Sequence, residues 1–108
     1  MTPSIDLRVE VLDATVPMGA RADVAGPARA KLIVSIQNGD GWMLDVIRNG
    51  LIEAMHSSRH ISTEQFCAVL DVPVQTSCTF KVACRREDIS ILSDPIILRL
   101  RSGTGEIC

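Results

Sequence analysis

The sequence has few aromatic residues and no long apolar run. Among its 108 residues there are no tyrosines, one tryptophan and two phenylalanines, so aromatic residues make up 3%. A site that stacks bases or encloses a cation needs several aromatic rings, and this chain has few to offer. No run of about 18 apolar residues occurs, which argues against a membrane-spanning helix. Charged residues precede any apolar stretch near the N-terminus, so we expect no secretory signal and a cytoplasmic protein.

The overall composition is that of an ordinary globular chain. Apolar residues make up 46% and charged residues 22% of the sequence, which is too apolar for an intrinsically disordered protein. Eleven basic and thirteen acidic residues give a formal net charge of −2. A chain of this length forms one domain with one core. We predict a single domain over residues 1–108, with a long loop at 14–30 and a loose C-terminal tail at 102–108.

The four cysteines form no recognisable metal or redox motif. They are Cys67, Cys78, Cys84 and Cys108, and no pair has the C-x-x-C spacing. We expect reduced thiols, with Cys78 and Cys84 on an apolar strand face and Cys67 on the opposite face. No phosphate-binding loop, nucleophile elbow or dinucleotide fingerprint occurs. The chain is predicted not to be an enzyme and to need no cofactor.

Alternation of apolar and polar residues predicts strands over 5–11, 31–37, 76–85, 89–91 and 96–101. Residues 62–74 fit two structures. The sequence Ser62-Thr63-Glu64-Gln65 fits a capping box that would start a helix. The apolar residues that follow would instead share one face of a strand: Phe66, Ala68, Leu70, Val72 and Val74. We favour the strand.

Residues 42–58 show a helical period. Apolar residues recur there at steps of three and four: Leu44, Ile47, Leu51, Ala54 and Met55. This spacing predicts an amphipathic helix with Asp40 as its N-cap and Gly50 as its weak point. The predicted fold class is therefore α+β, with one amphipathic helix packed on a mainly antiparallel sheet of about five strands.

Glu53, His56 and His60 are the candidate metal ligands. On a continuous helix they would lie at i, i+3 and i+7, so their side chains would lean towards one surface. Two histidines four residues apart can chelate a divalent ion, and Cys67 is a candidate fourth ligand. The di-iron and H-E-x-x-H patterns are both incomplete. A solvated polar face explains the same residues, so we assign no metal site and keep metal binding as a second alternative.

The candidate partner-binding residues are basic side chains and two large apolar ones. Outward-facing cations of the last strands would form a basic stripe that binds phosphates or an acidic protein surface: Lys81, Arg85, Arg86, Arg99 and Arg101. Met18, Arg21 and Arg29 belong to the predicted long loop, where recognition residues are common. Trp42 is a candidate anchor. A helix-turn-helix over 62–80 is disfavoured because its second segment alternates like a strand.

These features favour a small non-enzymatic protein-interaction module. Such a protein is a subunit, adaptor or inhibitor of a larger assembly, a class that includes phage-encoded inhibitors of bacterial defence complexes. A protein is the expected partner, and a homodimer is compatible with this function. The first alternative is a nucleic-acid-binding protein that uses the basic sheet face, although no aromatic residues lie between its arginines.

Overall fold

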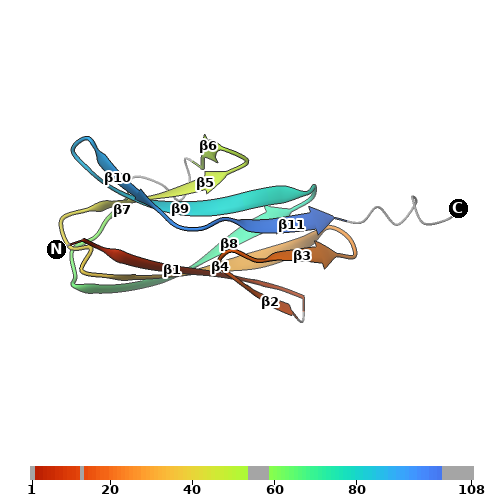
Figure 1. The fold of residues 1–108 in the computed structure, drawn as a ribbon. Helices are drawn as coiled ribbons and strands as arrows, with labels where there is room; N and C mark the ends of the chain where they lie inside the picture. Colours follow the sequence, from red (N-terminus) through yellow and green to blue (C-terminus); the bar gives the residue numbers. More distant parts are fainter. Residues whose placement is uncertain (1, 13, 54–58, 101–108) are drawn as a thin grey trace, which may run out of the picture.

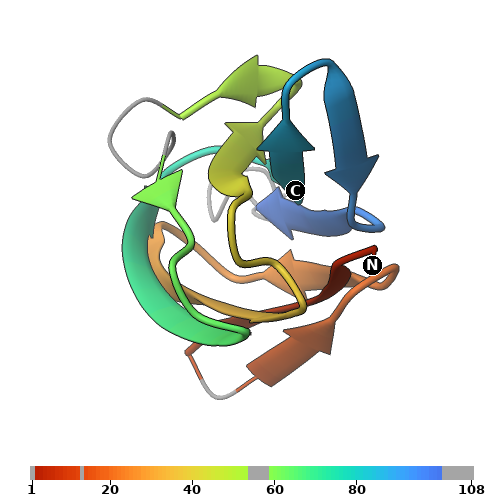
Figure 2. The same cartoon turned by 90° about the vertical axis from the view of Figure 1, so that its left-hand side faces the viewer.

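The structure, a computed structural model, describes residues 2–12, 14–53 and 59–100. All regular elements in these ranges are β-strands. The described residues therefore include no helix that is long and apolar enough to cross a membrane. The strands form two sheets that lie as two layers in Figure 1. Viewed end-on in Figure 2, the strands surround one common interior. The predicted α+β fold is wrong, because the residues that the structure describes form strands and no helix.

The first sheet is antiparallel and has the strand order β2-β1-β4-β8. Its strands are β1 (Ser4–Val11), β2 (Ala14–Pro17), β4 (Ala28–Gln37) and β8 (Gln65–Val74). Alternate residues of these strands, such as Leu7, Leu32 and Val34, are fully buried. The strands predicted over 5–11 and 31–37 are confirmed, and so is the strand favoured for 62–74, over residues 65–74.

The second sheet has seven strands, with the main order β3-β11-β9-β5-β6. In addition β10 pairs with β9, and β7 pairs with β5. The bounds are β3 (Arg21–Val24), β5 (Met43–Arg48), β6 (Leu51–Ile52), β7 (Arg59–His60), β9 (Cys78–Arg86), β10 (Ile89–Leu92) and β11 (Ile96–Leu100). The β3–β11 pair is parallel, and the others are antiparallel.

Ser93 lies between β10 and β11, two strands that pair with the same edge of β9, and it bonds to β9 where the ladder is interrupted. Its N–H donates to the Val82 carbonyl at 2.8 Å. Its hydroxyl oxygen accepts from the Val82 N–H at 2.9 Å. The serine side chain thus takes the place of a backbone carbonyl, and the buried Val82 groups stay bonded where the ladder is interrupted.

Residues 42–52 form a β-hairpin and not the predicted helix. β5 and β6 are joined by Asn49 and Gly50, whose φ values are 53° and 80°. A two-residue type I′ turn requires positive φ at both positions, and Asn-Gly meets this requirement with little strain. Trp42, Leu44 and Val46 are buried and alternate along the strand. The apolar residues therefore fit both a helical period and a period of two, and the Asn49-Gly50 turn decides in favour of the strand. Asp40 precedes β5 and caps no helix.

The predicted loop at 14–30 is mostly strand. It contains β2, which forms a hairpin with β1, and β3, which adds a parallel edge strand to the second sheet. It also contains the first residues of β4. Val16 and Val24 from this segment are buried in the core. Its high content of alanine, glycine and proline is typical of a loop, although it contains short segments in which buried and exposed residues alternate. The predicted tail at 102–108 lies outside the described residues.

The core lies between the two sheets and is largely aliphatic. Phe80 is 1% exposed and is the largest of its fully buried side chains. Cys78 and Cys84 are buried and Cys67 is exposed, as predicted. Trp42 is only 6% exposed and belongs to this core. Its ring is therefore not an exposed anchor, contrary to the expectation from sequence.

Candidate functional site

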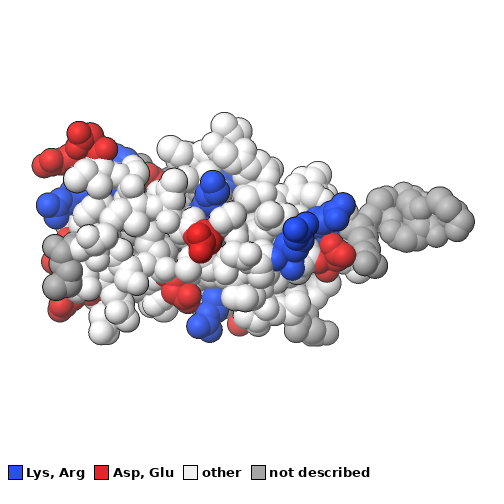
Figure 3. Space-filling view, in the orientation of Figure 1, with Lys and Arg blue, Asp and Glu red and all other residues white. Residues whose placement is uncertain are grey.

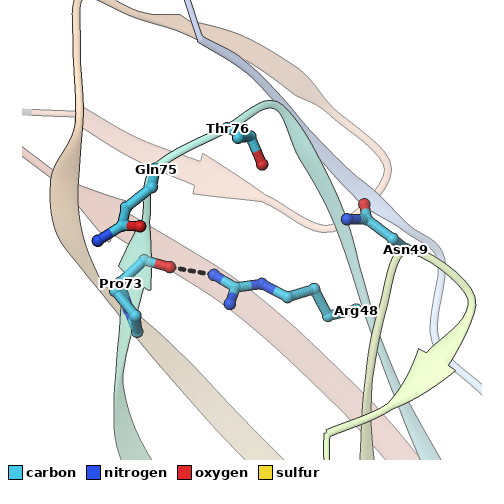
Figure 4. Close-up of a pocket in the computed structure, with 5 residues that line it drawn as sticks. All are labelled: Arg48, Asn49, Pro73, Gln75 and Thr76. Carbon is cyan, nitrogen blue, oxygen red and sulfur yellow. Dashed lines mark hydrogen bonds between the residues drawn. The ribbon is translucent and has the colours of Figure 1, made fainter.

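A hollow of about 190 Å³ lies where the β5–β6 hairpin meets the end of β8. Its lining residues are shown in Figure 4: Arg48, Asn49, Pro73, Gln75 and Thr76. None of these residues was among the candidates predicted from the sequence. Asn49 is held in place by Thr79, because its N–H donates to the Thr79 carbonyl and its Oδ1 accepts from the Thr79 N–H, both at 2.9 Å.

The Arg48 guanidinium connects the two sheets at this hollow. It donates to the Pro73 carbonyl on β8 (Figure 4) and lies 5.0 Å from the centre of the Phe80 ring. Its Nε is buried and has no hydrogen-bond partner among the described residues. Burial raises the pKa of the Cys78 thiol, and the nearby Arg48 charge opposes that rise. Arg48 therefore has a structural role, because it links β5 to β8. The hollow is also smaller than the roughly 300–1,000 Å³ of typical ligand pockets.

The outer face of the second sheet carries apolar side chains in neighbouring rows. Ile47 of β5 lies between Lys81 of β9 and Ile52 of β6. Leu92 and Ile97 lie along the other edge of β9. The exposed fractions are 63% for Ile52, 56% for Leu92 and 37% for Ile97. Met43 also points outward from β5. We call Met43, Ile47, Ile52, Leu92 and Ile97 the apolar face.

The outer face of the first sheet is polar by comparison. β1 presents Asp6, Arg8 and Glu10 there, and Glu10 lies opposite Lys31 of β4. Asp6 and Arg8 form an ion pair of 3.2 Å in which both side chains are more than half exposed. Such exposed pairs contribute little to stability. The two outer surfaces of the sandwich therefore differ in chemistry, and the second sheet has the more apolar one.

Four of the predicted partner-binding residues lie on the same side as the apolar face. Lys81 lies beside Ile47, and Arg85 lies beside Met43. Arg21 and Arg99 occupy the far end of the sheet, with Arg21 opposite Ile97. The structure therefore brings together basic and apolar side chains on one outer surface.

Two carboxylates accompany these cations. Arg85 Nε lies 3.0 Å from Asp45 Oδ2, and the Asp45 side chain is 5% exposed. The hydrogen bond and the charge of Asp45 raise the pKa of Arg85. Arg99 lies opposite Asp23 in the parallel β3–β11 pair. With four cations against two carboxylates, this surface is positive on a chain whose net charge is −2.

The predicted basic stripe is not continuous. Arg86 follows Arg85 on β9 and therefore points to the other side of the sheet. Its guanidinium lies 5.3 Å from the centre of the Trp42 ring. Arg101 lies outside the described residues. On the side of the molecule shown in Figure 3, red and blue side chains are interspersed and no unbroken blue band is visible.

The remaining predicted contacts lie elsewhere. Arg29 is on the outer face of the first sheet, opposite Pro73. Met18 is half-buried and packs against the core. The residues missed by the sequence analysis are Ile52, Leu92 and Ile97. Their signal was an apolar residue at the outward position of a strand, which can be recognised only when the strand and its inner face are known.

The candidate metal ligands are not arranged by a helix. Glu53 follows β6, His60 lies in β7, and His56 lies outside the described residues. Cys67 is exposed on β8 of the first sheet. Within the described ranges, no group of three or more histidine, cysteine or acidic side chains is placed to hold a metal ion. The helical spacing that suggested this site does not apply.

No protein-family model, curated protein or solved structure matches the chain. Function is therefore inferred from the chemistry of the surfaces.

Proposed function

We propose that this protein is a non-enzymatic interaction module that binds another protein through the apolar face and its surrounding cations. The observation that carries the proposal is the exposure of Ile52, Leu92 and Ile97 on one outer sheet surface. Antiparallel sheets with one solvated face normally place polar residues there. Several exposed apolar residues on one surface of a small domain, with charged residues among and around them, are typical of protein-binding sites.

The charges around the apolar face indicate the chemistry of the partner. Lys81, Arg21 and Arg99 give this surface its positive balance, so a complementary partner presents apolar side chains surrounded by carboxylates. Burying a large aliphatic side chain completely contributes about 1.5–3 kcal/mol, so the three exposed residues account for most of the expected affinity. The cations contribute chiefly to the association rate and to the choice of partner.

The test is a double substitution, Leu92→Glu with Ile97→Glu, compared with the unchanged protein. The partner is first identified by affinity capture from the source organism, then purified and titrated by calorimetry. Each residue is expected to contribute more than about 1 kcal/mol, so the double variant should bind at least tenfold more weakly. Raising the salt concentration should slow association of the unchanged protein.

The matched control places two glutamates on the other sheet, as Thr15→Glu with Gln37→Glu. Both positions are exposed, and the change in net charge is the same. This control should bind the partner with unchanged affinity. Equal binding by the control and the Leu92/Ile97 variant, with both folded by circular dichroism, would contradict the proposal. So would a complex with nucleic acid in a low-salt mobility shift that weakens when Arg99 is changed to alanine.

A further inference from the structure

The free edge of β8 is a second candidate contact surface. β8 pairs with β4 along all ten of its residues and with no other described strand. Unpaired N–H and C=O groups along an exposed edge form a template for another strand. Val69, at the centre of β8, is 59% exposed.

The register shows which groups of β8 point to the free edge. The Asn38 N–H donates to the Glu64 carbonyl at 2.7 Å, next to the Gln37–Gln65 pair. Hydrogen-bonded pairs alternate in an antiparallel ladder, so the even-numbered residues of β8 bond to β4. The odd-numbered residues direct their N–H and C=O groups away from it. Two contacts agree with this, because Gln65 and Pro73 use their carbonyls outside the ladder.

At both ends of this edge a backbone carbonyl already accepts a hydrogen bond, which closes the ends to another strand. The groups in the middle of the edge remain open. The Thr63 hydroxyl donates to the Gln65 carbonyl at 2.7 Å. Arg48 donates to the Pro73 carbonyl, and proline has no N–H. Between them, three residues keep an outward N–H and C=O with no partner among the described residues: Cys67, Val69 and Asp71. Gln65 and Pro73 each lie four residues from Val69. The open segment is therefore symmetric about Val69.

We propose that two copies of this chain pair antiparallel through β8 around a two-fold axis at Val69. In this register Val69 faces its counterpart, and Cys67 of each copy faces Asp71 of the other. Each copy donates its three N–H groups to the carbonyls of the other, which gives six hydrogen bonds. The two first sheets become one continuous sheet, and the two exposed Val69 side chains contact each other. This surface is separate from the apolar face, so the inference does not depend on the proposed function.

The symmetry of the closed ends favours a second copy over an unrelated extended peptide. A shift of the register by two residues would place Pro73 or Gln65 in the new ladder, where a carbonyl is already occupied. The register centred on Val69 gives a partner to every N–H and C=O of Cys67, Val69 and Asp71. Asp71 then faces a thiol and not a second carboxylate, and within its own chain it lies opposite Lys31. Like charges directly opposite each other, which would destabilise the pair, are avoided.

Sedimentation equilibrium tests the dimer. A strand-to-strand contact is a small interface, so we expect reversible dimerisation over about 10 µM to about 1 mM. Val69→Pro removes the central outward N–H and leaves the bonds to β4 in place, because that N–H does not take part in them. Its dimerisation should be at least tenfold weaker. Val69→Thr keeps the N–H and the β-branched shape, and it should dimerise like the unchanged protein.

A cysteine cross-link tests the register independently. In a Cys67→Ser, Cys108→Ser background, Val69→Cys places two thiols on opposite residues about 5.5 Å apart between Cα atoms, within the range for a disulfide. It should cross-link under mild oxidation. Cys67, kept in a Cys108→Ser background, should not, because the two Cys67 positions are four strand residues, about 13 Å, apart.

Several results would overturn the inference. They are a monomer at all concentrations, a dimer that Val69→Pro leaves unchanged, or a cross-link through Cys67 and not through position 69. Binding of an extended peptide from another protein at the edge of a monomeric chain would also count against it. The Leu92→Glu, Ile97→Glu variant should still dimerise, so loss of partner binding and loss of the dimer are distinguishable.

Discussion

Replacing Phe80 with alanine is expected to lower the free energy of unfolding by about 3–5 kcal/mol, because it opens a cavity in the core. Phe80 is 1% exposed, and no fully buried side chain of the described core is larger. It also supports the Arg48 guanidinium, which lies 5.0 Å from the ring centre. A small domain has a total stability of only about 5–15 kcal/mol, so the loss is a large part of it.

Urea unfolding followed by the fluorescence of the single tryptophan measures this loss. Two control variants set the scale. Phe80→Leu fills most of the cavity and should cost clearly less. Phe66→Ala removes a ring that is only half-buried and should also cost less. A Phe80→Ala variant that loses less than about 1 kcal/mol would show that this ring is not buried between the sheets.

Raising the pH from about 9 to about 11 is expected to destabilise the folded protein by about 2–3 kcal/mol. Burial raises the pKa of Cys84 from 9.0 to about 11, and the neighbouring Asp45 carboxylate acts in the same direction. In this window the unfolded chain loses the thiol proton before the folded chain does, so rising pH favours unfolding. The stabilisation is fully present below pH 9 and is lost as pH rises through 11.

Unfolding in urea at a series of pH values, with reductant present, measures this dependence. The absence of tyrosine removes the phenol groups that normally titrate in the same range. Cys84→Ala should flatten most of the slope. Burial also raises the pKa of Cys78, so Cys78→Ala should remove part of the remainder. A slope that both substitutions leave unchanged would contradict the burial of these thiols.

Strands with strict alternation were predictable from the sequence, and the hairpin at 42–52 was not. Along β1 and β4 the apolar residues fit only a period of two. In β5 and β6 the same leucine and isoleucine residues fit a helical period as well, so periodicity left the structure undecided. The Asn49-Gly50 pair carried the deciding information, because both residues adopt positive φ in a two-residue turn. Treating it as a weak point in a helix produced the wrong fold class.

The candidate surfaces were predictable only in part. Lys81, Arg85 and Arg99 were correctly expected to face outward from their strands. The exposed Leu92 and Ile97 were missed, because an apolar residue on a strand is normally assigned to the core. The free edge of β8 could not be found from sequence, since strand order across a sheet depends on contacts between distant segments. The hydrogen bond from Arg48 to the Pro73 carbonyl could not be predicted either, because it depends on β5 and β8 meeting at one end of the sandwich.

The open edge of β8 follows from its register with β4, so amide hydrogen exchange along β8 tests this central claim most directly. In dilute protein, where the chain is monomeric, the amides of Phe66, Ala68, Leu70 and Val72 should exchange slowly. Those of Cys67, Val69 and Asp71 should exchange quickly, and they should become protected as the concentration rises. Uniform protection of consecutive amides in dilute protein, or fast exchange of the even-numbered amides, would contradict the β4–β8 register and the dimer surface that follows from it.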